Sequence, residues 1–271
     1  MDVKTSSGLM MALGLGALVT VGSGFAAAGT ETVEAVPPDV ATTRAPVTPA
    51  MADGQWHIRA AGARIIGGYG HNFAYDGENV RPLRGEAEMR LNTADGTGEL
   101  EITLHTTPES GPVRFSADQA WEGEIRIVNR LNTSEMDMAR VTEEAWLHGD
   151  TGNEAPVMPK VFNYFATWGP SQIFVNGEQV VPMIGSHTMF SEQARGADGK
   201  IERDGQVYSP MVQDKEGFTD PSETEFHYVA HTTEPDPNNF PPHTAWIHLH
   251  FSDVEVLEKP ADVEIPYTRT Q

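Results

Sequence analysis

Residues 86–105, EAEMRLNTADGTGELEITLH, predict a β-hairpin. Apolar and polar residues alternate in 86–92 and again in 99–105, so each segment has one buried and one solvated face. The intervening TADGTG (93–98) contains an aspartate and two glycines, which tolerate the backbone angles of a turn. A hairpin with one wet and one buried face is typical of antiparallel all-β folds.

The rest of the chain repeats this β signal. Asn176-Gly177 predicts a second hairpin, since it is the favoured two-residue turn. Further strands are expected at His57–Ile66, Glu124–Leu131, Val161–Thr167, Glu225–His231 and Thr244–Leu257. Ser134–Trp146 and Thr188–Arg195 carry helix-start or helix-end signals. We therefore expect an all-β fold, an antiparallel β-sandwich or jelly-roll-like domain with one or two short helices.

The N-terminus predicts a signal peptide over residues 1–28. Lys4 precedes the apolar run Leu9–Val21, and small residues follow up to Ala28, where we expect cleavage. The apolar run is too short and too rich in glycine to make a comfortable transmembrane span. An uncleaved anchor is the alternative, because Asp2 weakens the positive start. The mature protein is expected in the periplasm or secreted outside the cell.

Two further regions follow the signal peptide. Residues 29–52 are a low-complexity segment of proline, threonine and alanine with no hydrophobic period, which predicts a linker. Residues 53–271 are long enough for one hydrophobic core and are expected to form a single β-sandwich domain.

The charge limits the partners. The 271 residues include 39 acidic and 18 basic side chains, for a net charge of −21. Such a protein repels phosphate backbones and anionic headgroups, so we expect neither nucleic acid nor an anionic membrane as a partner. A metal ion or a cationic protein fits better. Because the chain has no cysteine, a metal site must use histidine, carboxylate, methionine or backbone ligands.

Histidines near the C-terminus form the most informative cluster, with five of the ten between residues 227 and 250. In FHYVAH (226–231), period-2 geometry puts His227 and His231 on one strand face. In TAWIHLHF (244–251) the same geometry puts His248 and His250 on the face opposite to the aliphatic residues. The connection between the segments is rich in proline and ends at His243.

If these two segments pair antiparallel, their histidine faces become neighbours. Imidazoles at positions i and i+2, about 6.5–7 Å apart along the backbone, can then converge on one copper or zinc ion. The candidate ligands are His227, His231, His243, His248 and His250, with Glu225 or Glu223 as a carboxylate and His187 brought near by fold closure. Methionines 136, 138, 158, 183 and 189 are candidate soft Cu(I) ligands, or else core residues. A bulge is expected near Ser252-Asp253, where the alternation changes register.

Other functions remain open. Histidine is an ordinary resident of polar strand faces, and Trp121, Trp146, Trp168 and Trp246 could instead form a sugar-stacking platform. The chain has no G-x-S-x-G, H-E-x-x-H or phosphate-loop signature, which argues against an enzyme without excluding one. We expect an exported metal-binding protein, with a metal-free carbohydrate- or protein-interaction module and a histidine-metal enzyme as alternatives.

Overall fold

The computed structural model describes residues 54–265, so the predicted signal peptide and linker lie outside the described residues. The described part contains no helix, only strands, turns and loops. Its strands are β1 (Gln55–Gly68), β2 (Arg81–Pro82), β3 (Arg84–Asn92), β4 (Thr97–His105), β5 (Val113–Arg114), β6 (Ala120–Trp121), β7 (Glu124–Asn132), β8 (Arg140–Leu147), β9 (Val161–Val175), β10 (Glu178–Gln193), β11 (Glu202–Arg203), β12 (Gln206–Val207), β13 (Asp220–His231) and β14 (Trp246–Glu258).

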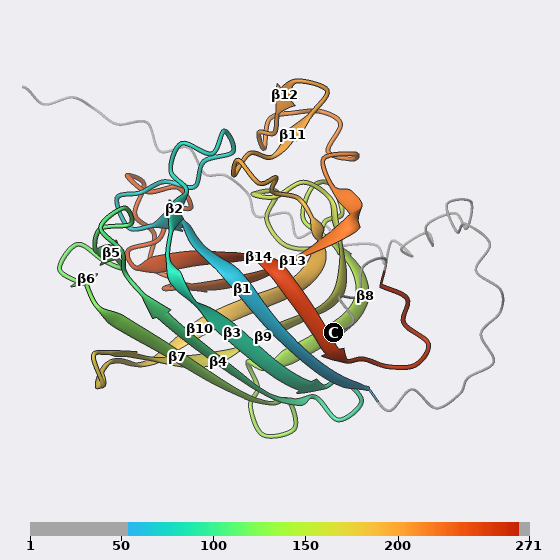
Figure 1. Ribbon diagram of the computed structural model, residues 1–271, viewed down its shortest axis with the longest axis horizontal. Coiled ribbons are helices and arrows are strands. Elements are labelled where there is room, and N and C mark those ends of the chain that lie inside the picture. The colour runs from blue at the N-terminus through green and yellow to red at the C-terminus, as the bar shows by residue number, and fades with distance from the viewer. Residues whose placement is uncertain (1–53, 266–271) are drawn as a thin grey trace, which may run out of the picture. The chain divides into compact units, whose positions relative to one another are not determined.

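Eight of these strands close into an antiparallel barrel. Their order is β10–β13–β14–β1–β3–β4–β7–β9, and β9 also pairs with β10, which joins the two ends (Figure 1). Strand β8 extends the sheet beyond the barrel by pairing with the first half of β9. The all-β, antiparallel expectation is confirmed. A sandwich or jelly roll is not confirmed. Alternating strands look the same in a sandwich and in a barrel, and it is the pairing of β9 along both edges that closes this sheet into a barrel.

One hydrophobic cluster fills the barrel. It includes residues from all eight barrel strands. Trp56 on β1 packs its ring edge-on against Phe165 on β9, with ring centroids 5.2 Å apart, and against Phe190 on β10 at 5.8 Å. Neither β9 nor β10 is a neighbour of β1 in the sheet, so these contacts cross the interior. A small barrel filled by side chains leaves little room for a ligand there.

Both predicted hairpins are present. Strands β3 and β4 pair from Arg84↔His105 to Asn92↔Thr97, in the register that their alternation requires. The β9–β10 turn has Asn176 at φ 49° and Gly177 at φ 83°, the backbone expected of a two-residue Asn-Gly turn.

Both predicted helices are wrong. Ser134–Trp146 is a turn followed by most of β8, and Thr188–Arg195 is largely the end of β10. In β10 the run Thr188, Met189, Phe190 and Ser191 is buried on both faces. A strand that is covered on both sides needs no apolar–polar alternation, so the strand signal disappears there.

The predicted bulge at Ser252-Asp253 is also absent. The pairs Ala61↔Asp253 and Ala63↔Phe251 keep one register. On either side of this point, however, opposite faces of each of the two strands point into the barrel. Gly62 makes the switch possible with a φ of 67°, and a Cβ there would lie 2.5 Å from the Ser252 hydroxyl oxygen.

The outer face of β13 and β14 is covered instead of being exposed. Phe226, Tyr228 and Ala230 belong to the interior cluster, so the alternate residues of β13 point outward. Over this outer face lies a second cluster, here called the outer cluster. It consists of Ile66, Phe73, Met158, Ala194, Ile201, Tyr208, Phe218 and Trp246.

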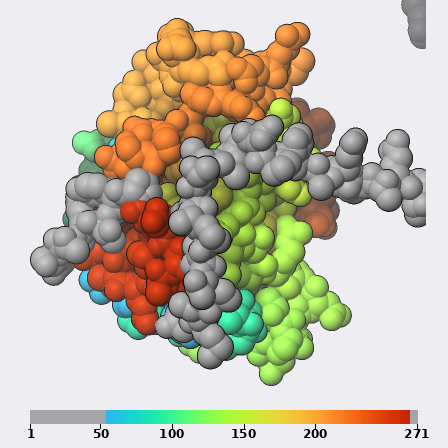
Figure 2. All heavy atoms as spheres, turned by 90° about the vertical axis from the view of Figure 1, so that its right-hand side faces the viewer, coloured from blue at the N-terminus to red at the C-terminus, as the bar shows by residue number. Residues whose placement is uncertain are grey.

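Long connections supply most of the outer cluster. They are residues 69–80 after β1, 148–160 after β8 and 194–219 after β10. Figure 1 shows the β11–β12 hairpin and the β1–β2 connection rising on the same side of the barrel. In Figure 2 the segment that carries β11 and β12 (orange) forms the upper part of the face in view. Side chains on the outer face of β13 and β14 are therefore buried beneath a cap of loops.

Candidate metal centre

The candidate metal centre forms where β13 and β14 pair. His227 lies directly opposite His250 in the antiparallel register, so both side chains project from the same outer face. Glu225 precedes His227 by two residues on the same strand and therefore shares that face. All three side chains are completely buried. Glu225, His227 and His250 are here called the triad.

The triad is held together by short contacts. Glu225 Oε1 lies 2.7 Å from His227 Nε2, and Glu225 Oε2 lies 2.9 Å from His250 Nε2. One nitrogen or oxygen from each residue falls within 4.8 Å of the other two. This buried group could hold a metal ion, since two imidazoles and one carboxylate are a common set of ligands for transition metals.

A second ring of contacts orients the triad. His248 Nε2 lies 3.0 Å from His227 Nδ1, so one of these two nitrogens donates to the other. The backbone N–H of Arg195 donates to Glu225 Oε2 at 3.1 Å. His250 Nδ1 has no hydrogen-bond partner among the described residues.

Arg195 fastens the cap above these groups. Its buried guanidinium donates to the carbonyl of Gly199 and, at 3.0 Å, to the carbonyl of Ala74, so it joins two connections. The guanidinium also lies 4.9 Å from the centre of the Phe73 ring, and Phe73 stacks on His248 with centroids 5.1 Å apart. The burial of the triad therefore depends on loops distant in sequence.

The charges suit metal binding. Burial by itself raises the pKa of Glu225, but the charges and hydrogen bonds of His227 and His250 outweigh it and hold the pKa well below its usual value. Burial lowers the pKa of His250 to about 4, although the contact with Glu225 acts in the opposite direction. Burial also lowers the pKa of His248 well below its usual value. At neutral pH the site thus offers an ionised carboxylate and neutral imidazole at His250.

The five histidines predicted from the sequence divide into two groups. His227, His248 and His250 come together around Glu225. His231 and His243 instead stack on each other, with ring centroids 4.0 Å apart, in a separate place. The reason is distance along the strand, since residue 231 is four positions beyond 227, or about 13 Å.

Of the two carboxylates considered from the sequence, the structure selects Glu225. Glu223 lies on the same strand but is exposed, next to an irregularity in the β10–β13 register. Arg195 gave no signal in the sequence as part of the site. It reaches the triad only through the tertiary packing of the connection after β10.

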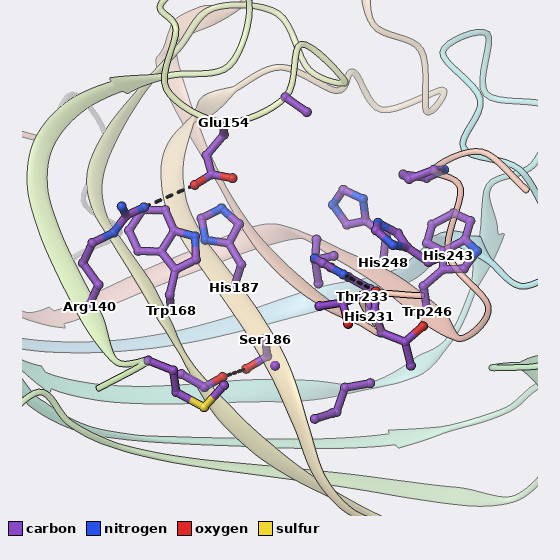
Figure 3. A pocket seen from close by; sticks show the side chains of 18 of the residues that line it. Arg140, Glu154, Trp168, Ser186, His187, His231, Thr233, His243, Trp246 and His248 are labelled. Atoms are coloured by element: carbon purple, nitrogen blue, oxygen red, sulfur yellow. Dashed lines mark hydrogen bonds and ion pairs between the residues drawn. The ribbon is translucent and has the colours of Figure 1, made fainter. Parts of the chain in front are cut away.

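A cavity of about 890 Å³ adjoins the triad. Figure 3 shows Trp168 and His187 on one side of it, and His231, His243, His248 and Trp246 on the other. His248 lines this cavity, whereas the three triad residues do not. His248 therefore stands between the triad and the cavity.

The tryptophans do not form an exposed platform. Trp121 and Trp246 are buried in the two clusters, and Trp168 lines the cavity beneath the Arg140 guanidinium, 3.7 Å from its ring centre. Among the described tryptophans, only Trp146 is exposed.

Comparison with protein family models, curated proteins and solved structures gives no match. Within residues 54–265 there is also no helix long and apolar enough to cross a membrane. The site itself therefore carries the functional argument.

Proposed function

We propose that this chain is a metal-binding β-barrel protein that holds one Zn²⁺ or Cu²⁺ ion between Glu225, His227 and His250. The observation that carries the proposal is the meeting of three potential ligands, all completely buried, with donor atoms within 4.8 Å of one another. Burial disfavours the charged form of histidine and requires a partner for its ring nitrogens, and a bound ion is one partner that meets this requirement.

The separations are close to those that an ion would impose. Tetrahedral bonds of 2.0–2.1 Å place neighbouring ligand atoms about 3.3 Å apart. The present contacts of Glu225 with His227 and His250 measure 2.7 and 2.9 Å. These contacts run to different carboxylate oxygens, so an ion held by both oxygens has to widen each contact by about half an ångström and displace the proton from each Nε2.

The surrounding contacts also fit. When an ion occupies His227 Nε2, the ring proton sits on Nδ1 and is donated to His248 Nε2, 3.0 Å away. The N–H of Arg195 keeps Glu225 oriented through the 3.1 Å contact with Oε2. Outer contacts of this kind fix ring orientation and increase affinity for metal.

The enclosure of the triad favours a holding role over catalysis. A catalytic metal keeps one position open to substrate, whereas a structural metal is closed off by protein. None of the triad residues lines the cavity, and all three are shielded from solvent. We therefore propose storage of the ion, or stabilisation of the cap by it, in a protein exported to the periplasm or beyond.

Metal analysis tests this proposal. The purified protein, loaded with Zn²⁺ or Cu²⁺ and then desalted, is expected to retain about one ion per chain. Glu225→Gln keeps the shape of the side chain but removes its charge, and it should weaken retention at least roughly tenfold. Loading with each metal separately identifies the preferred ion.

Glu223→Gln is the matched control. It makes the same chemical change two residues away on the same strand, where the side chain is exposed. It should retain metal like the unaltered protein. Equal metal content in both variants would contradict the proposal, as would an unaltered protein that retains neither metal.

A further inference from the structure

A second group of unprotonated donor atoms lies next to the triad. His187 and Met189 are two residues apart on β10, and His148 follows the last residue of β8. The rings of His148 and His187 have centroids 6.3 Å apart. All three residues line the cavity, and Met189 lies directly opposite His227 in the β10–β13 register.

His148 and Met189 make a contact that hydrogen bonding does not explain. His148 Nδ1 lies 2.7 Å from the carbonyl oxygen of Ala155, and a carbonyl only accepts, so the proton is on Nδ1. Nε2 then carries a bare lone pair, 3.2 Å from Met189 Sδ, which is also an acceptor. Burial lowers the pKa of His148, so this ring does not gain a second proton at neutral pH. Two lone pairs therefore face each other in a buried place.

His187 repeats the pattern. Its Nδ1 lies 3.2 Å from the carbonyl oxygen of Thr167, so it too carries the proton on Nδ1. Its Nε2 is buried and has no hydrogen-bond partner among the described residues. Trp168 stacks on the ring with centroids 4.5 Å apart, which fixes the direction of the lone pair. Burial also lowers the pKa of His187 to about 3.

We propose that His148 Nε2, His187 Nε2 and Met189 Sδ bind one Cu(I) ion at the wall of the cavity. The donors are two neutral imidazoles and a thioether, and soft sulfur ligands select Cu(I) over Zn²⁺ or Ca²⁺. A cation between the three atoms would satisfy lone pairs that have no donor. This site shares no ligand with the triad, so the inference goes beyond the proposed function and does not rest on it.

The surroundings provide an access path and a partner for the nearby positive charge of Arg140. Met138 and Met183 also line the cavity and are 54% and 68% exposed, so thioethers lead from solvent toward the site. Glu154 lines the same cavity and lies 3.2 Å from the Arg140 guanidinium, which keeps that positive charge paired. The paired guanidinium therefore opposes an added cation less than a free one would.

Anaerobic titration with Cu(I) in competition with the chromophoric chelator bicinchoninate tests the site. The unaltered protein should withdraw Cu(I) from the chelator, and Met189→Leu should weaken that binding at least roughly tenfold. Leucine conserves the volume of a buried methionine, so folding should be preserved. Met211→Leu is the control, because it removes an exposed thioether that does not line the cavity, and it should bind Cu(I) like the unaltered protein.

X-ray absorption of the Cu(I)-loaded unaltered protein gives a second readout that needs no variant. A sulfur scatterer beside nitrogen neighbours is expected. Nitrogen neighbours alone, Met189→Leu affinity equal to that of the unaltered protein, or no Cu(I) binding at all would each overturn the inference. Glu225→Gln should bind Cu(I) normally, so failure of the triad and failure of this site are distinguishable.

Discussion

Substituting Glu225 separates the contribution of metal binding to stability from the stability of the metal-free fold. In the unaltered protein, an ion that binds only the folded state raises the free energy of unfolding by about 4 kcal/mol at a free concentration 1,000 times its Kd. Glu225→Gln should lower this increment by at least about 1.4 kcal/mol, the equivalent of a tenfold weaker Kd, because the amide is a poor ligand and lacks the negative charge that neutralises the ion.

The metal-free stability of Glu225→Gln should change much less. Glu225 accepts from His227, His250 and the Arg195 N–H at 2.7, 2.9 and 3.1 Å. A glutamine oxygen placed at Oε2 keeps the last two contacts, and its amide can donate to His227 Nε2 after that ring changes tautomer. The substitution loses the extra strength that a charged acceptor gives each hydrogen bond, about 1 kcal/mol per bond. This loss is offset because the buried negative charge, which costs several kcal/mol to desolvate, is removed. We expect a net change within about 2 kcal/mol.

Urea unfolding, followed by tryptophan fluorescence, measures the metal-free stability when a chelator is present. The same measurement with Zn²⁺ or Cu²⁺ gives the increase that metal binding causes. Trp56 and Trp246 are buried, so unfolding changes their surroundings. Glu223→Gln should respond to metal like the unaltered protein. An equal metal-dependent rise in Glu225→Gln would refute the assignment of Glu225 as a ligand.

Three further predictions concern the fold. First, the protein in the presence of a chelator should lose unfolding free energy as the pH falls from about 6.5 towards 4. In the unfolded chain, histidines bind protons in this range, whereas in the folded protein His250 and His187, with pKa values of about 4 and 3, do not. In urea unfolding, His187→Gln should reduce this dependence by about 1.4 kcal/mol per pH unit, and an unchanged slope would contradict it. Second, Arg195→Met leaves two backbone carbonyls without their donor, so unfolding free energy should fall by about 3 kcal/mol and amide exchange in residues 69–80 should accelerate. Third, Gly62→Ala should lower the melting temperature more than Gly205→Ala, since both have positive φ but only Gly62 has a neighbouring atom, 2.5 Å from the new Cβ.

Much of the fold was readable from local patterns. The alternation in 86–105 correctly indicated β3, β4 and their turn, and Asn176-Gly177 correctly indicated the β9–β10 hairpin. Period-2 geometry also placed His248 and His250 on the face of their strand that points away from the aliphatic interior. These features depend on near neighbours in the chain, whose geometry the residue types dictate.

The helix predictions were wrong, and the sandwich was not confirmed, for a different reason. Residues of β10 around Met189 are buried on both faces, so the alternation that marks a strand is lost. Barrel and sandwich use the same strands, and the difference is whether β9 finds a partner along both edges. That choice depends on how the whole sheet curls, which no single segment encodes.

The amino-acid sequence by itself determined the antiparallel β character, the absence of thiol ligands and the shared strand face of His248 and His250. Only the tertiary structure selected Glu225 over Glu223, separated His231 from the triad and set His148 against Met189. The physical reason is burial. Strand geometry decides which side chains point the same way, but loops from distant parts of the chain decide which of them lose contact with water and must find partners within the protein.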